Sequence, residues 1–158
     1  MSGRAGVPLT ETLLLAVWIG AALLFTLVVA PAAFAVLPTR SLAGALVGRV
    51  LPVIFYAGVV IGSLIVVLDV IGRTGAWGRS AAGAVAALSC AVAQLVVGTR
   101  IDRLRAAISG PLDALGGDDP RRVAFGRLHA ISVGWLGVAM LAAIVALTLA
   151  VRAVPPRQ

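Results

Sequence analysis

Four long stretches of this chain carry no Asp, Glu, Lys or Arg, and this pattern constrains the fold more than any other feature of the sequence. Charged side chains are costly in the hydrocarbon core of a bilayer, and a helix that crosses that core needs roughly 20 mostly apolar residues. Because no water is available there, the backbone of each stretch must form its hydrogen bonds internally, which favours helices. The stretches are residues 12–39, 50–68, 80–99 and 128–151.

The composition supports a membrane location and argues against soluble classes of protein. Hydrophobic residues make up 61% of the chain, charged residues make up 12%, and the mean hydropathy is +1.09. Soluble domains average about 45–50% apolar and about 25% charged residues. The sequence is therefore unlike a water-soluble enzyme. The four stretches also lack the period-two alternation of a transmembrane β-barrel.

We predict an all-α integral membrane protein in which four helices form an antiparallel bundle, because the connections between the stretches are short. The first helix is expected to remain in the mature protein and not to be cleaved as a signal peptide, since its apolar stretch exceeds the roughly 7–15 residues of a secretory signal core. We expect the third helix to continue beyond Arg100, and the fourth to begin with Asp119 as its N-cap and Pro120 at the first helical position. The whole chain, residues 1–158, is expected to be a single membrane domain with spans at about residues 13–37, 50–71, 80–99 and 124–151.

Small residues recur at close spacing inside the stretches, and such residues allow membrane helices to approach one another closely. Gly and Ala are so common in this chain that composition alone also produces such pairs, so both interpretations stay open at this point. The pairs are Ala16 and Gly20 in the first stretch, Gly58 and Gly62 in the second, Gly83 and Ala87 in the third, and Gly134 and Gly137 in the fourth.

Arginine supplies all of the positive charge: 13 Arg and no Lys stand against six acidic residues, for a formal net charge of +7. The arginines lie between the apolar stretches and form no basic helix face, so we interpret them as topology signals and headgroup anchors rather than as a nucleic-acid site. The positive-inside rule places the richer side in the cytoplasm and both termini on the non-cytoplasmic side of the inner membrane. Five lie on the terminal side (Arg4, Arg73, Arg79, Arg152 and Arg157) and eight lie opposite (Arg40, Arg49, Arg100, Arg103, Arg105, Arg121, Arg122 and Arg127).

Several polar, aromatic and proline residues gather at the arginine-rich ends of the predicted helices. His129 is an ionisable residue at the membrane edge, where it either relays a proton or binds a ligand, or else bonds a backbone carbonyl, Tyr56 or Gln94. Gln94 is expected to bond between helices, and Pro31 is expected to bend the first helix and free a carbonyl group. The candidate functional cluster is His129, Tyr56, Gln94, Arg100, Ser132, Pro31 and Phe34.

The sequence contains none of the residue sets that common enzyme reactions require. It has no nucleophile accompanied by a general base and a residue that orients the base, and no Gly-rich loop that binds phosphate. It also has no group of residues spaced to bind a metal ion. The single cysteine, Cys90, is interpreted as a packing residue, and Asp69 is expected to pair with Arg73 four residues along the helix. We therefore expect no catalytic residues, no bound metal and no cofactor, which favours a protein that is not an enzyme.

Three strings stand in order near the helix ends: Trp18-Ile19-Gly20, then Ala30-Pro31-x-x-Phe34 with Leu37-Pro38, then Phe125-Gly126-Arg127-Leu128-His129-Ala130-Ile131-Ser132. Together they resemble the transmembrane-protein-205-like domain family, small four-helix membrane proteins of unknown biochemical activity. The resemblance covers about residues 13–151. It implies a multi-pass protein surrounded by the lipid bilayer that serves in binding, transport support or assembly. The family often carries an Asn shortly after the final Ser, and residues 133–136 supply none.

Two further expectations follow from the size of the bundle and from a looser likeness. A bundle this small needs copies or partners to enclose a pathway, which favours a homo-oligomer. The Trp18-x-Gly20 start is similar to the copper-resistance-D and HemJ-type membrane proteins, which implies a haem- or redox-linked protein as the alternative. His129 is the only histidine, so a bis-histidine haem within one chain is excluded. Met140 lies about 16 Å further along the same predicted helix, too far to share the iron.

Overall fold

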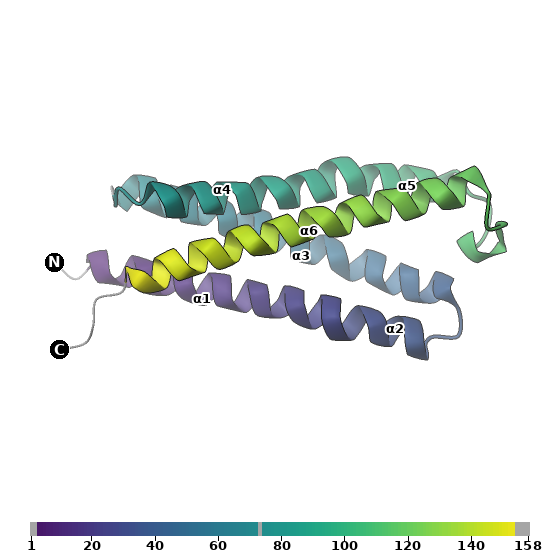
Figure 1. Cartoon of the computed structure of the whole chain (residues 1–158), viewed down its shortest axis with the longest axis horizontal. Helices are drawn as coiled ribbons and strands as arrows, with labels where there is room; N and C mark the ends of the chain where they lie inside the picture. Colours follow the sequence, from purple (N-terminus) through teal and green to yellow (C-terminus); the bar gives the residue numbers. More distant parts are fainter. Residues whose placement is uncertain (1–2, 73, 154–158) are drawn as a thin grey trace.

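Four helical rods make up the chain in the computed structural model, which describes residues 3–72 and 74–153 (Figure 1). The rods run up and down in turn, so the two ends of the described chain lie at the same end of the bundle. Four helices are long and apolar enough to cross a membrane, and no strand occurs among the described residues, which confirms the predicted all-α four-helix membrane bundle. These helices are Leu9–Val36, Arg40–Gly72, Trp77–Ala106 and Pro120–Arg152.

Two of the rods contain a wider π-helical turn between α-helical parts. The third rod continues to Ala106, as expected, and the second begins at Arg40, so this helix includes residues that precede the apolar stretch. The first rod consists of α1 (Gly3–Leu24), the π turn η1 (Phe25–Val29) and α2 (Ala30–Val36), and the second is α3 (Arg40–Gly72). The third consists of α4 (Trp77–Ala91), the π turn η2 (Val92–Gly98) and α5 (Thr99–Ala106), and the 3-10 helix η3 (Leu112–Ala114) precedes the fourth rod, α6 (Pro120–Arg152).

The irregularity expected at Pro31 takes the form of the π turn η1. Proline has no backbone N–H, and its ring crowds the carbonyl group four residues earlier, which here belongs to Leu27. The N–H of Ala30 donates to the carbonyl oxygen of Phe25, five residues back, and this wider turn stands directly before the proline. The first rod therefore passes through Pro31 without ending.

The rods pack as a ring in which each lies mainly against two neighbours. α1 lies against α3 and α6, and α4 lies against the same two helices. The buried centre includes Trp18, Phe55 and Leu136, and the indole N–H of Trp18 donates to the backbone carbonyl of Ile54 at 2.9 Å, which ties α1 to α3. Many large apolar side chains, such as Val60, stay exposed on the outside of the ring. Helices that are apolar on all sides are expected where the outer surface meets lipid.

Glycines bring α3 and α4 into close contact. A Cβ on Gly62 would lie 2.6 Å from the carbonyl oxygen of Gly83, and a Cβ on Gly58 would lie 2.5 Å from the sulfur of Cys90. The two helices approach this closely only because these positions lack side chains. The small-residue interpretation is therefore confirmed for Gly58 and Gly62 on α3, and for Gly83 and Ala87 on α4.

The same prediction is wrong for the first and fourth helices within one chain. Ala16 is exposed, and a Cβ on Gly20, Gly134 or Gly137 would meet nothing within 4 Å. These residues point away from the bundle because another face of each helix is turned inward. On α6 the buried face is formed by Ser132, Leu136, Ala139, Ala143, Ala146 and Ala150.

The start of α6 follows the sequence-based prediction. The Asp119 side chain accepts the backbone N–H of Arg121 at 2.8 Å, and Pro120 is the first helical residue, so Asp119 is the N-cap. The Arg121 guanidinium also donates to this carboxylate, and these hydrogen bonds lower the pKa of Asp119 to about 2. The loop before α6 is tied back to α3, because the Asp113 carboxylate accepts the backbone N–H of Ser41 at 2.8 Å.

Candidate functional site

A cavity of about 170 Å³, here called the inner chamber, lies at the arginine-rich end of the bundle. All four rods contribute to its wall, through α2, α3, η2 with α5, and α6. Apolar side chains make up most of the wall and a few polar side chains join them, a composition typical of small-molecule sites. The apolar lining includes Phe34, Val47, Leu51, Phe55 and Phe125, and the polar and charged lining consists of Gln94, Asp102, Arg105, His129 and Ser132.

The structure brings part of the predicted cluster together at this chamber. The residues that meet there come from α2, η2 and α6, which are distant in the sequence. Ser132 is buried, whereas His129 is exposed. Tyr56 is 52% exposed and lies away from the chamber. Phe34, Gln94, His129 and Ser132 line the inner chamber, and Pro31, Tyr56 and Arg100 do not.

Arg105, Phe125 and His129 stack on one another beside the inner chamber. The Phe125 and His129 rings are nearly parallel, with 4° between their planes and 6.3 Å between their centroids. The guanidinium carbon of Arg105 lies 5.1 Å from the centroid of the Phe125 ring. His129 thus packs on Phe125, and within the described chain it forms no hydrogen bond with Tyr56 or Gln94, the two side chains considered as its partners from the sequence.

Arg105 is seated against two glycines of α3. One terminal nitrogen, Nη2, donates to the carbonyl oxygen of Gly44 at 3.2 Å. A Cβ on Gly48 would lie 2.8 Å from the other terminal nitrogen, so the missing side chain leaves the space that the guanidinium occupies. From the sequence, Arg105 is expected only to be one of the arginines that set the topology. The four-residue spacing of Gly44 and Gly48 is the signal that could have revealed this packing site for a large side chain.

A second cavity of about 460 Å³, here called the outer chamber, adjoins the inner one. Because Arg105 lines both cavities, its side chain stands at their junction. The outer chamber is bounded partly by the segment between α5 and α6. The residues shared by both chambers are Phe34, Gly44, Arg105 and Phe125, and the other charged residues of the outer chamber are Arg40, Asp113 and Arg122.

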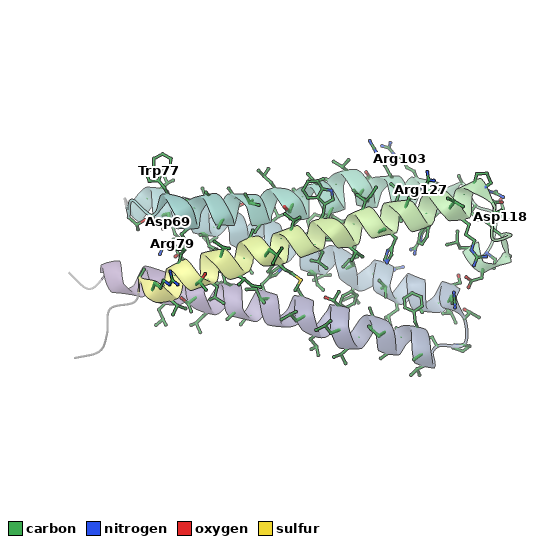
Figure 2. The ribbon with its side chains drawn as sticks, viewed as in Figure 1. Asp69, Trp77, Arg79, Arg103, Asp118 and Arg127 are labelled. Atoms are coloured by element: carbon green, nitrogen blue, oxygen red, sulfur yellow. The ribbon has the colours of Figure 1, made fainter. Side chains whose placement is uncertain are left out.

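A buried ion cluster lies at the opposite end of the bundle, where Figure 2 shows Asp69 and Arg79. Arg79 of α4 pairs with Asp69 of α3, and its Nε lies 3.0 Å from a carboxylate oxygen of Glu11 in α1. Arg73, the partner expected for Asp69, lies outside the described residues. Arg79 is 3% exposed, so the interpretation of this residue as a headgroup anchor is wrong: its two acidic partners hold it inside the bundle.

The two carboxylates of the ion cluster differ in their hydrogen bonding. Asp69 accepts from Arg79 Nε at 3.1 Å, from the Thr74 hydroxyl at 3.0 Å and from the Ser80 hydroxyl at 2.9 Å. The Glu11 oxygens have no hydrogen bond among the described residues, because the Arg79 contact has ion-pair distance without hydrogen-bond alignment. The cluster joins α1, α3 and α4 and is a structural contact remote from the chambers. Glu11 was not predicted as a member of this cluster, although its position as an acidic residue at the edge of the first apolar stretch was a signal for a buried partner.

The fold and the chambers define a class, that of small four-helix membrane proteins with a mostly apolar cavity between the helices. The chain belongs to the family described as Domain of unknown function (DUF4149), which matches residues 13–109. The matched part includes Phe34, Gln94 and Arg105 of the inner chamber, whereas His129 and Ser132 of α6 lie beyond it. No curated protein and no solved structure matches the chain.

Proposed function

We propose that this protein binds a small, largely apolar molecule in the inner chamber and serves in transport support or assembly rather than in catalysis. The observation that carries the proposal is that all four rods meet at this one cavity. A mostly apolar wall with a few polar groups is the usual form of a small-molecule site. Here Gln94, His129 and Ser132 are the polar groups available to orient a ligand.

The irregular helix beside Gln94 supports a binding role. Gln94 and Gly98 both belong to the π turn η2 and both line the inner chamber. π-helical turns inside α-helices occur frequently at functional sites. A Cβ on Gly98 would lie 3.4 Å from the amide nitrogen of Gln94, so this glycine keeps space open beside the amide.

The chamber lies where the first and last rods separate. α1 packs against α6, whereas α2, the continuation of the same rod, has no substantial packing with α6. Figure 1 shows the two rods diverging toward this end. Phe34 of α2 and His129 of α6 both line the chamber, so a molecule dissolved in the bilayer would enter between these two rods.

We also propose that the chain is a member of the transmembrane-protein-205-like family, that it lies in the inner membrane, and that its termini lie on the non-cytoplasmic side. The resemblance to the transmembrane-protein-205-like family is supported because Phe34, His129 and Ser132, which belong to the strings that carry it, line the inner chamber. An orientation with both termini on the non-cytoplasmic side is supported because Arg79 is buried, which leaves four arginines on the terminal side against eight on the other. The inner-membrane location stays a prediction. The homo-oligomer stays a prediction, which chemical crosslinking in native membranes tests.

The binding role is tested by filling the inner chamber. Leu51→Trp places an indole in the wall of the chamber, and Val53→Trp is the matched control because Val53 is 66% exposed on the same helix. We expect native mass spectrometry of the protein released from membranes to detect a bound molecule on the wild type and the control, and to find it lost from Leu51→Trp. Equal retention by both variants would show that the chamber is not the binding site.

The haem-linked alternative receives no support from the chamber. His129 is exposed, and the described lining residues offer no second imidazole and no sulfur ligand, so they do not fit a haem with two axial protein ligands. An absorption spectrum of protein expressed with ample haem tests this alternative. A Soret band that is lost in His129→Phe would favour it over the binding role proposed above.

A further inference from the structure

The walls of the two chambers differ in character. In the inner chamber Val47, Phe55 and Ala93 are buried apolar residues. The outer chamber instead is bounded by three arginines, Arg40, Arg105 and Arg122, with one acidic residue, Asp113. An apolar space that opens into a basic one suits a molecule with an apolar part and an anionic part.

The arginines of the outer chamber outnumber its one carboxylate, Asp113, three to one. None of the three forms an ion pair within the described chain. The Asp113 carboxylate accepts the backbone N–H of Ser41, and the Arg122 guanidinium donates to the carbonyl oxygen of Leu115 at 3.0 Å. An excess of positive charge beside a cavity with low-dielectric walls attracts anions.

Arg105 has the geometry and the free donors to hold an anionic group. A guanidinium carries five N–H donors, and in the described chain Arg105 uses Nη2 toward Gly44. The Phe125 ring under the guanidinium and the space at Gly48 hold it at the junction of the chambers. Planar guanidinium groups bind carboxylate and phosphate groups through paired hydrogen bonds.

We propose that the two chambers together bind one amphipathic anion, with its carboxylate or phosphate group on Arg105 and its apolar tail in the inner chamber. The inference rests on the proposed function and specifies the class of ligand. Two sources share this chemistry: an anionic phospholipid of the surrounding bilayer and a free long-chain carboxylate. Asp102 also lines the inner chamber, but it is exposed and forms no ion pair with Arg105.

The ligand class is tested with three probes on the purified full-length chain in neutral detergent: phosphatidylglycerol, phosphatidylcholine with the same acyl chains, and oleate. We expect native mass spectrometry to show one phosphatidylglycerol or one oleate bound in preference to phosphatidylcholine. Binding of phosphatidylglycerol without oleate identifies the bilayer lipid as the source, and the reverse identifies the free carboxylate. Equal binding of the neutral and both anionic probes overturns the inference.

The role of Arg105 is tested with a matched pair of variants on α5. Arg105→Gln and Arg103→Gln remove the same charge from one helix, but Arg103 is exposed and lines neither chamber (Figure 2). We expect Arg105→Gln to weaken binding of the anionic probe about tenfold, or about 1.4 kcal/mol, while Arg103→Gln keeps wild-type binding. Arg105→Lys, which keeps the charge, is expected to fall between them. Equal binding by the two glutamine variants overturns the assignment to Arg105.

Leu51→Trp separates failure of this inference from failure of the proposed function. If this variant loses all three probes while the wild type shows no preference for anions, the chamber binds ligands and only the anion assignment fails. If it binds every probe as the wild type does, the proposed function fails as well. Thermal unfolding of each variant identifies any loss of binding caused by misfolding.

Discussion

The guanidinium carbon of Arg105 lies 5.1 Å from the centre of the Phe125 ring, and this contact joins α5 to α6 at the junction of two cavities. His129, one helical turn further along α6, stacks on the same ring with 4° between the two planes. A cation above an aromatic face is attracted by the negative charge of that face. The contact therefore positions the charged group of the candidate site from two separate helices.

Energetic coupling between Arg105 and Phe125 is the first prediction. In a double-mutant cycle with Arg105→Gln and Phe125→Leu, we expect the two variants together to lose about 0.5–1 kcal/mol less stability than the sum of the single losses, because either change removes the same contact. Unfolding by titration with a denaturing detergent measures the free energy of unfolding of each variant in the cycle. A coupling energy of zero would mean that the contact contributes nothing to stability.

The buried ion cluster predicts opposite sensitivities for two of its members. Arg79→Met leaves Glu11 and Asp69 buried without a positive partner, and we expect a loss of about 3–5 kcal/mol in the free energy of unfolding. Glu11→Gln is expected to cost less than about 1 kcal/mol, because the Glu11 oxygens have no hydrogen bond in the described chain and the remaining pair is neutral. Detergent unfolding measures both values. Equal losses would contradict this arrangement of the ion cluster.

Close packing of α3 on α4 makes a prediction about glycine substitutions. Gly62→Ala would place a Cβ 2.6 Å from the carbonyl oxygen of Gly83, and we expect this overpacking to cost about 1–3 kcal/mol. Gly20→Ala is the control, since a Cβ there meets nothing within 4 Å. Thermal unfolding of the two variants in the same detergent compares them. A stable Gly62→Ala variant would show that the helices need not be this close.

The N-cap of α6 predicts a dependence of stability on acid pH. Hydrogen bonds from Arg121 lower the pKa of Asp119 to about 2, below about 3.9 for an unfolded aspartate. The ionised carboxylate therefore stabilises the folded chain above about pH 4, and this contribution is lost as the pH falls toward 2. We expect the difference in melting temperature between the wild type and Asp119→Asn to shrink over that range. Asp118→Asn, which removes a carboxylate from the same turn and leaves the N-cap in place, is the matched control.

The proposed orientation predicts the behaviour of reporter fusions. Green fluorescent protein fused after Gln158 is expected to stay dark, because it folds to its fluorescent form in the cytoplasm and the proposal places this end outside. The same reporter fused after Gly117, in the segment between α5 and α6, is expected to fluoresce. The opposite pattern would reverse the sidedness while leaving the bundle unchanged.

Features that depend on one segment of chain are those that the sequence predicts well. The four apolar stretches without charge give the number and the approximate place of the long helices, because the cost of placing a charge in lipid applies to each segment alone. Asp119 followed by Pro120 marks the start of α6, because capping is a bond between neighbouring residues. The number of helices and their short connections also predict an antiparallel order, which places Phe34, Gln94, His129 and Ser132 at one end of the bundle, where the inner chamber lies.

The rotation of each helix about its axis is decided only by packing in three dimensions. These helices are apolar on all sides, so the periodicity of the sequence does not indicate which face turns inward. Tyr56 therefore lies outside the chamber, whereas Arg105 reaches the glycines of α3. The ion-pair partners of Arg79 also depend on these rotations, because Glu11 and Asp69 meet it from two other helices. A bond between distant segments depends on how the helices face one another, and that geometry exists only in the assembled bundle.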